Sequence, residues 1–150
     1  MQLKTIAFFV ALLLLGTCFA TAQPYNNAIG AHIGSPGGVT FKHFTSDRFA
    51  IEGILGAYFG PTGGVNLVIL GENHSELFFP DLYLVYGLGA HAGSVDQSLL
   101  LGGDGILGLE YNFGSSPFNF MIDIKPRIGL QDGGFQFGMD GGLALRYLLN

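Results

Sequence analysis

Hydrophobic residues alternate with polar or small residues along most of the chain after residue 25. The clearest stretch is FNFMIDIKPRIGL, residues 118–130, where Asp123, Lys125 and Arg127 stand at every second position between apolar residues. Successive side chains of an extended strand point to opposite faces, so these charges would share one face and the isoleucines the other. Helical three- and four-residue spacing of apolar residues does not persist. The pattern therefore predicts β-strands.

Eight such runs are separated by short segments rich in glycine, proline, aspartate and serine, which favour turns. The predicted strands are residues 28–34, 39–44, 49–59, 65–70, 81–92, 102–113, 118–130 and 135–149. Residues 72–80 are predicted to form a longer connection. Strands joined by short turns favour an antiparallel up-and-down meander in which the first strand closes against the last. We therefore expect an all-β, eight-stranded antiparallel barrel in one domain.

One face of each predicted strand is apolar, whereas the other mixes charged residues with glycine. A soluble barrel buries its apolar face; a membrane barrel turns that face to lipid and lines its interior with polar groups. Strands longer than about 10 residues favour the transmembrane barrel over the alternative of a soluble secreted one. Aromatic residues near strand ends, as in interfacial girdles, favour it too: Tyr58, Phe59, Phe78, Phe79, Tyr83, Tyr111, Phe113, Phe118 and Tyr147.

In a transmembrane barrel the charged residues would form a structural network in the lumen. The predicted network comprises Lys42, Glu52, Asp104, Glu110, Asp123, Lys125, Arg127, Asp140 and Arg146, and the lumen face also carries His32 and His91. Five acids against four bases suit a buried ionic network, because an unpaired buried charge costs several kcal/mol. Pro126 cannot donate to a ladder, so we expect a bulge there or a position beyond the hydrocarbon layer.

Residues 1–22 have the composition of a cleaved secretory signal peptide. Lys4 precedes an apolar core, and Ala20-Thr21-Ala22 is a small-residue cleavage signal, so the barrel domain is expected to comprise residues 23–150. The apolar run is short for a membrane-spanning helix, which needs about 20 residues. Cys18 leaves a lipoprotein signal as an alternative. Cleavage would remove this only cysteine, and with it any disulfide or thiol chemistry.

Charge narrows the range of partners. The chain has a formal net charge of −5, and only 11% of its residues are charged; soluble domains typically have about 25%. An acidic chain without a basic patch is not expected to bind nucleic acid.

Several segments carry a family resemblance: IGAHIGSPGGVTFKHF, FAIEGILGAYF, YGLGAHAG, GGDGILGLEYNF and GGLALRYLL. Together they resemble the small outer-membrane β-barrel domain proteins of Gram-negative bacteria, which share the eight-stranded architecture of OmpX and OmpA. The resemblance implies an outer-membrane location with both termini in the periplasm. It also implies contact with outer-membrane lipid and, during biogenesis, with periplasmic chaperones and the barrel insertion machinery. It implies no activity and no cofactor. The chain departs from the family in having no tryptophan and in ending without an aromatic residue.

The expected function is a structural or interaction role without catalysis. The alternative is a lipid-modifying enzyme of the lipid A deacylase or acyltransferase type. His74, Ser75 and Glu76 supply the residue types of a hydrolase triad, and His91 lies three residues before Ser94, where eight-stranded lipid A deacylases have a histidine and a serine two apart. A narrow ion-conducting pore is a further alternative, although side chains just fill the interior of eight strands. His32 and His91 lack an evident third ligand, so no metal site is expected.

Overall fold

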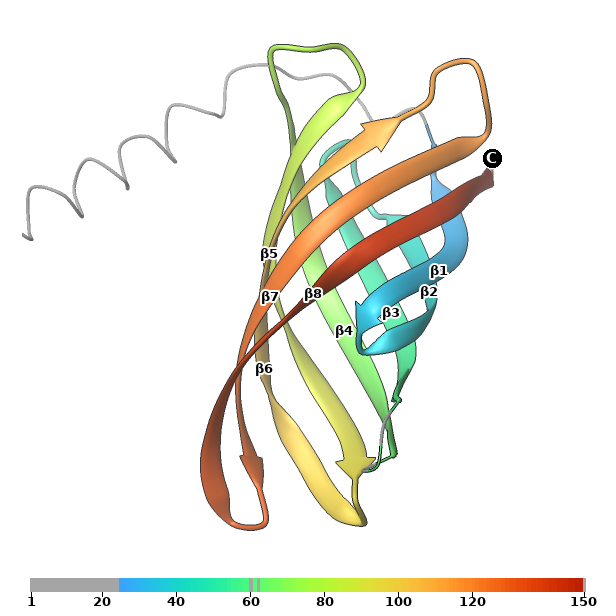
Figure 1. The fold of residues 1–150 in the computed structure, drawn as a ribbon. Helices are drawn as coiled ribbons and strands as arrows, with labels where there is room; N and C mark the ends of the chain where they lie inside the picture. Colours follow the sequence, from blue (N-terminus) through green and yellow to red (C-terminus); the bar gives the residue numbers. More distant parts are fainter. Residues whose placement is uncertain (1–24, 60, 62, 150) are drawn as a thin grey trace, which may run out of the picture.

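The computed structural model describes residues 25–59, 61 and 63–149, which form a closed barrel of eight antiparallel strands (Figure 1). Each strand pairs with its neighbours in sequence, and β1 closes against β8. The prediction of an all-β, eight-stranded antiparallel barrel is confirmed; the predicted signal peptide, residues 1–22, lies outside the described residues. The strands are β1 (Asn27–Ser35), β2 (Gly37–Phe44), β3 (Phe49–Tyr58), β4 (Gly64–Glu76), β5 (Leu82–Val95), β6 (Ser98–Asn112), β7 (Phe118–Gln131) and β8 (Gly134–Leu149).

The barrel has two distinct ends. The terminal end carries the start of β1, the end of β8 and the β2–β3, β4–β5 and β6–β7 connections (Figure 1). The hairpin end carries the other four connections, β1–β2, β3–β4, β5–β6 and β7–β8. Two hairpins have two-residue turns in which both central residues have positive φ: Asp96 and Gln97 (51° and 65°), and Asp132 and Gly133 (53° and 75°). This turn geometry matches the twist of the flanking strands. The connection between β5 and β6 is therefore much shorter than the interval between the predicted strands 81–92 and 102–113.

Side chains alternate strictly between the outside and the lumen. On β7, Ile122 and Ile124 are 51% and 49% exposed, whereas Asp123 and Lys125 are 4% and 1% exposed. The other strands follow the same rule, so the apolar face of the sheet points outward and the charged face points inward. None of the residues that the structure describes belongs to a helix long and apolar enough to cross a bilayer.

Strand β4 is longer than predicted. It continues through residues 71–76, of which the sequence analysis assigned residues 72–76 to a connection. Glu72 and His74 are buried, and they continue the inward positions of Val68 and Leu70. Polar residues at every second position are typical of a lumen-facing strand as well as of a loop. The prediction of a connection was wrong for residues 72–76, and the β4–β5 connection is residues 77–81.

Two aromatic residues predicted near the strand ends point into the barrel. Tyr83 is only 4% exposed, and the hydroxyl of Tyr58 accepts a hydrogen bond from Asn66 Nδ2 at 3.1 Å. Both lie on the lumen side of their strands and so are not part of an outer aromatic belt. Phe59, Phe78 and Phe79 are exposed at strand ends.

Pro126 lies within β7 without a bulge. The β6–β7 register is the same before and after it, with Asp104 opposite Arg127 and Leu107 opposite Ile124. Pairing with β6 lapses only between these positions, where Pro126 has no N–H to donate. Gly105 faces the ring, and a Cβ added there would lie 3.2 Å from Pro126 Cγ. A small residue opposite the proline thus replaces the expected bulge.

The wall of the barrel is uneven in height. Strands β1, β2 and β3 have 9, 8 and 10 residues, whereas β5, β6, β7 and β8 have 14, 15, 14 and 16. At the hairpin end, the β5–β6 and β7–β8 hairpins extend beyond the β1–β2 hairpin (Figure 1). The register of β1 with β8 ends at Ser35 opposite Gly141.

The β7–β8 turn should not tolerate a β-branched residue at its second position. Gly133→Val would force a β-branched residue to φ 75° and should lower the free energy of unfolding by roughly 1–2 kcal/mol. Gly134→Ala is the control, because its Cβ would meet only Gln131 O at 3.5 Å. Urea unfolding of both variants checks this, and equal midpoints would contradict the assigned turn.

Candidate functional site: the charged lumen

Buried side chains occupy the lumen. Three groups of charged residues occupy it together with an apolar cluster. The apolar cluster consists of Ile54, Val68, Leu70, Val85, Ile106, Met121 and Ala144. The sequence analysis placed mainly charges and glycine on this face, so the extent of apolar packing inside the barrel is a finding of the structure.

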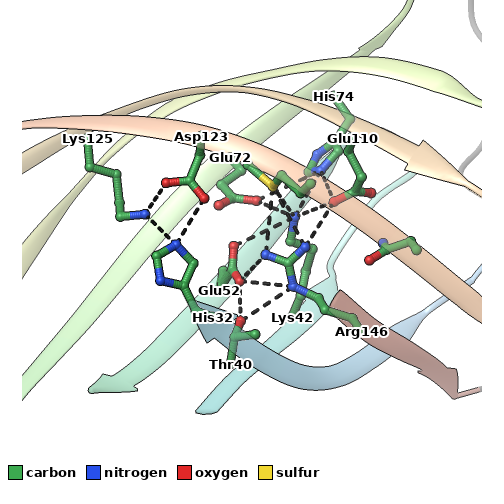
Figure 2. Close-up of polar contacts among 12 residues, drawn as sticks. His32, Thr40, Lys42, Glu52, Glu72, His74, Glu110, Asp123, Lys125 and Arg146 are labelled. Carbon is green, nitrogen blue, oxygen red and sulfur yellow. Dashed lines mark hydrogen bonds and ion pairs between the residues drawn. The ribbon is translucent and has the colours of Figure 1, made fainter. Parts of the chain in front are cut away.

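The first charged group, the central cluster, consists of Lys42, Glu52, Glu72, His74, Glu110 and Arg146 (Figure 2). Lys42 lies at its centre. Its Nζ is 2.7 Å from Glu110 Oε2, 2.8 Å from Glu72 Oε2 and 3.6 Å from Glu52 Oε2. These carboxylates come from β6, β4 and β3, so one ammonium group joins four strands across the lumen.

Arg146 of β8 forms the second cationic centre. Its Nη2 forms an ion pair with Glu52 Oε1, its Nε donates to the same oxygen at 3.1 Å, and its Nη1 is 3.5 Å from Glu110 Oε2. Thr40 Oγ1 also donates to Glu52 Oε1. Glu52 and Glu110 are therefore each shared by both cations, an arrangement that compensates their burial.

Glu72 is the least compensated member of the central cluster. The cluster has three carboxylates and two permanent cations. Among the described residues, Glu72 Oε1 has no hydrogen-bond partner, and its only permanent cationic neighbour within ion-pair distance is Lys42. His74 Nε2 lies 3.8 Å from both Glu72 Oε2 and Glu110 Oε2. A proton on His74 or on a carboxyl group would balance the charge.

An aromatic lid covers the central cluster at the terminal end. Tyr25, which precedes β1, is 3% exposed and donates to Glu110 Oε1 at 2.7 Å. Burial, and then the Glu110 charge, raise the pKa of Tyr25 well above its usual value, so the phenol stays a donor. The Tyr25 ring meets Phe44 edge to face at 5.1 Å between centroids, and Phe44 stacks at a tilt on His74 at 4.7 Å.

The second charged group consists of His32, Asp123 and Lys125 (Figure 2). His32 Nδ1 donates to Pro36 O at 2.9 Å, because a carbonyl oxygen can only accept. His32 Nε2 lies 3.0 Å from Asp123 Oδ2 and 2.9 Å from Lys125 Nζ, and Lys125 also pairs with Asp123. This group ties β1 to β7 across the barrel.

The third charged group lies toward the hairpin end. His91 Nδ1 donates to Asp104 Oδ2 at 2.8 Å, which joins β5 to β6. Arg127 Nε lies 3.2 Å from Asp140 Oδ2, and Ser35 Oγ donates to Asp140 Oδ1 at 3.2 Å. The Arg127 side chain is 27% exposed, more than any other charge of the lumen ion pairs. A Cβ at Gly138 would lie 2.6 Å from Arg127 Nε, so this glycine makes room for the arginine.

The structure places every residue of the predicted network on the lumen face, in three groups rather than one. It adds Glu72 and His74, which the sequence analysis missed because it ended β4 too early. The detectable signal was parity: both residues continue the even-numbered inward positions of Asn66, Val68 and Leu70. Among the described residues, six buried acids thus face four permanent cations in the lumen, with three histidines beside them.

The two candidate hydrolase groupings are not brought together. His91 and Ser94 are three residues apart in the continuous strand β5, so their side chains lie on opposite faces. The same parity separates His74, which is buried in the lumen, from its neighbour Ser75. Histidine, cysteine and acidic side chains form no metal-binding group of three or more in the described ranges. The chemistry that this lumen supports is mutual neutralisation of charges.

The imbalance of the central cluster predicts opposite responses to two isosteric changes. Glu72→Gln leaves two carboxylates with two permanent cations, so the free energy of unfolding in urea should be unchanged or higher by up to ~1 kcal/mol. Glu110→Gln removes the partner of Lys42, Arg146 and Tyr25, and should cost about 3 kcal/mol. Equal losses in the two variants would contradict the assignment of Glu72 as the excess charge.

Burial predicts unequal roles for the two lumen arginines. Arg146→Leu leaves Glu52 and Glu110 short of a cation in a site that is 1% exposed or less, and should lower stability by about 3–5 kcal/mol. Arg127→Leu, with its partly exposed pair, should cost about 1 kcal/mol or less. Urea midpoints of the two variants test this, and a larger loss for Arg127→Leu would refute it.

Comparison with known proteins adds no relative: no protein-family model, no curated protein and no solved structure matches this chain. What is established is therefore the architecture, a closed eight-stranded antiparallel barrel with a charged and filled lumen.

Proposed function

We propose that the protein is a small integral membrane barrel of the outer membrane of a Gram-negative bacterium, with a structural or interaction role and no catalysis. The observation that carries this proposal is the inversion of side chains: large apolar residues cover the outside of all eight strands, while ionised groups are buried within. A barrel in lipid requires this arrangement, because hydrocarbon surrounds it and only the lumen can hold charge.

Closure of the sheet supports the same proposal. Backbone groups inside a bilayer must find partners within the protein, and a closed barrel provides them without a helix. Strands β4 to β8, with 13–16 residues, exceed the ~9–11 that a tilted strand needs to cross. A soluble protein with this outer surface would expose a continuous apolar belt, whereas soluble monomers rarely expose patches beyond a few hundred Å².

The filled lumen favours a structural role over transport. The central cluster, the apolar cluster and the lid of Tyr25 and Phe44 occupy successive parts of the interior. Eight strands enclose a space that side chains just fill. The opposite orientations of His91 and Ser94 on β5 also argue for a non-catalytic role. An ion-conducting pore would require these ion pairs to separate.

Tryptophan fluorescence can test the membrane location, because the chain contains no tryptophan. Ile124→Trp introduces one on the outward face in the middle of β7, where Ile124 is 49% exposed. The protein should insert into vesicles, and lipids brominated in mid-chain should quench this residue strongly.

Ser115→Trp is the matched control, since Ser115 is exposed in the β6–β7 connection. It should be quenched several-fold less by the same lipids. Equal weak quenching of both variants, or recovery of the folded protein in the aqueous phase without detergent, would refute the membrane proposal.

A further inference from the structure

The first part of β8 lacks a neighbouring strand on one side. β1 covers β8 only as far as Gly141, opposite Ser35. In the part of the chain that the structure describes, no backbone pairing covers residues 134–140 of β8 on the side away from β7. β7 pairs with these residues on the other side up to Gly134. The tall side of the barrel therefore ends in an open sheet edge.

The hydrogen-bond pattern identifies which backbone groups this edge presents. Leu148 N donates to Pro117 O at 2.8 Å, and the β7–β8 register continues unbroken from there to Gln131 opposite Gly134. Hydrogen-bonding positions alternate along an antiparallel ladder. Even-numbered residues of β8 therefore bond to β7, and Phe135, Phe137 and Met139 direct their N–H and C=O groups to the open edge.

The side chains beside the open edge are also uncovered. Phe135, Phe137 and Met139 point outward and are 71%, 81% and 67% exposed, against 40% and 51% for Leu143 and Leu145, where β1 flanks the strand. Phe137 and Met139 form one wall of an outer groove of about 750 Å³ that reaches Leu88 and Pro126. Apolar side chains thus accompany a row of unpaired backbone groups.

We propose that residues 134–140 of β8 form a docking edge for an extended segment of another protein, which would pair antiparallel to β8 and continue the β1–β8 ladder. The partner segment would carry large apolar side chains at its outward positions, next to Phe137 and Met139. Small or polar side chains would suit its inward positions, next to Gly138 and Asp140. Strand addition of this kind draws affinity from main-chain hydrogen bonds.

The unpaired backbone groups of the edge determine the kind of occupant. A lipid tail could cover the phenyl rings, but it has no donor or acceptor for the N–H and C=O groups of this edge. A second copy of the barrel fits poorly. Two copies with the same orientation in one membrane run their β8 strands in the same direction, so their edges cannot form an antiparallel ladder.

The test uses the folded protein in lipid nanodiscs and a synthetic peptide that alternates valine with serine and has lysines at its ends. Without the peptide, the amides of Phe135, Phe137 and Met139 should exchange rapidly with deuterium, while those of Gln136 and Gly138 stay protected by β7. Saturable slowing of the odd-numbered amides by the peptide would support the docking edge. Protection of these amides without the peptide, or no slowing at saturating peptide, would overturn it.

A pair of variants separates backbone pairing from side-chain contact. Phe137→Pro and Phe137→Ala both remove the ring, but only Phe137→Pro also removes the N–H that faces the edge. Because Phe137→Pro removes no hydrogen bond of the β7–β8 ladder, the barrel should still fold, and heat-modifiable migration in detergent gels checks this. The proline variant should bind the peptide about tenfold more weakly than the alanine variant, the effect of one lost backbone hydrogen bond. Equal binding by the two variants would overturn strand pairing.

This inference rests on the proposed membrane location. The tryptophan experiment tests that location separately, so failure of the two proposals can be told apart: a barrel that inserts into vesicles yet leaves the peptide unbound would refute only the docking edge.

Discussion

The arrangement of the barrel depends on ion pairing around the ammonium group of Lys42. Its Nζ reaches carboxylates from three other strands, and Arg146 shares two of them. Buried charges are tolerated only when each is closely matched. The outer face of the sheet is apolar, so these charges have no alternative position on the outside. Matching them inside the lumen is what allows the sheet to close with its hydrophobic face outward.

This pairing also links parts of the chain that are far apart in sequence. Tyr25 reaches Glu110, Arg146 reaches Glu52, and His32 reaches Asp123. Each contact spans the interior, whereas the ladder joins only neighbouring strands. The lumen contacts therefore add rigidity across the barrel, and they leave its interior closed by side chains. This closure is the physical basis for proposing a structural or interaction role for the protein.

The uneven wall gives the barrel one side that differs from the rest. β1 to β3 are short, and residues 134–140 of β8 extend past the end of β1. In this part of β8 the backbone groups of the odd-numbered residues are unpaired. An exposed edge of this kind is usually shortened, charged or covered, because it is a template for pairing with another chain. Here it carries phenylalanine and methionine, and this composition is the reason for assigning it to recognition.

The sequence by itself determined the strand count, the antiparallel order and the inward position of residues such as Asp123, Lys125 and Arg146. These follow from two-residue alternation and turn chemistry, which are local properties of the chain. Local pattern also misled, because Glu72 and His74 have the polar character of a loop although they continue a strand inside a barrel. Tyr83 and Tyr58 were likewise assigned to an outer belt although their parity places them inside.

Only the tertiary structure decided which charges meet, because pairing across the lumen depends on register and on barrel closure. The grouping of Lys42 with Glu72 and Glu110, the lid formed by Tyr25, and the accommodation of Pro126 by Gly105 each join residues from different strands. The open edge of β8 is a further case, since it arises from the difference in length between β1 and β8. Alternation along one strand carries no information about the strand that lies across from it.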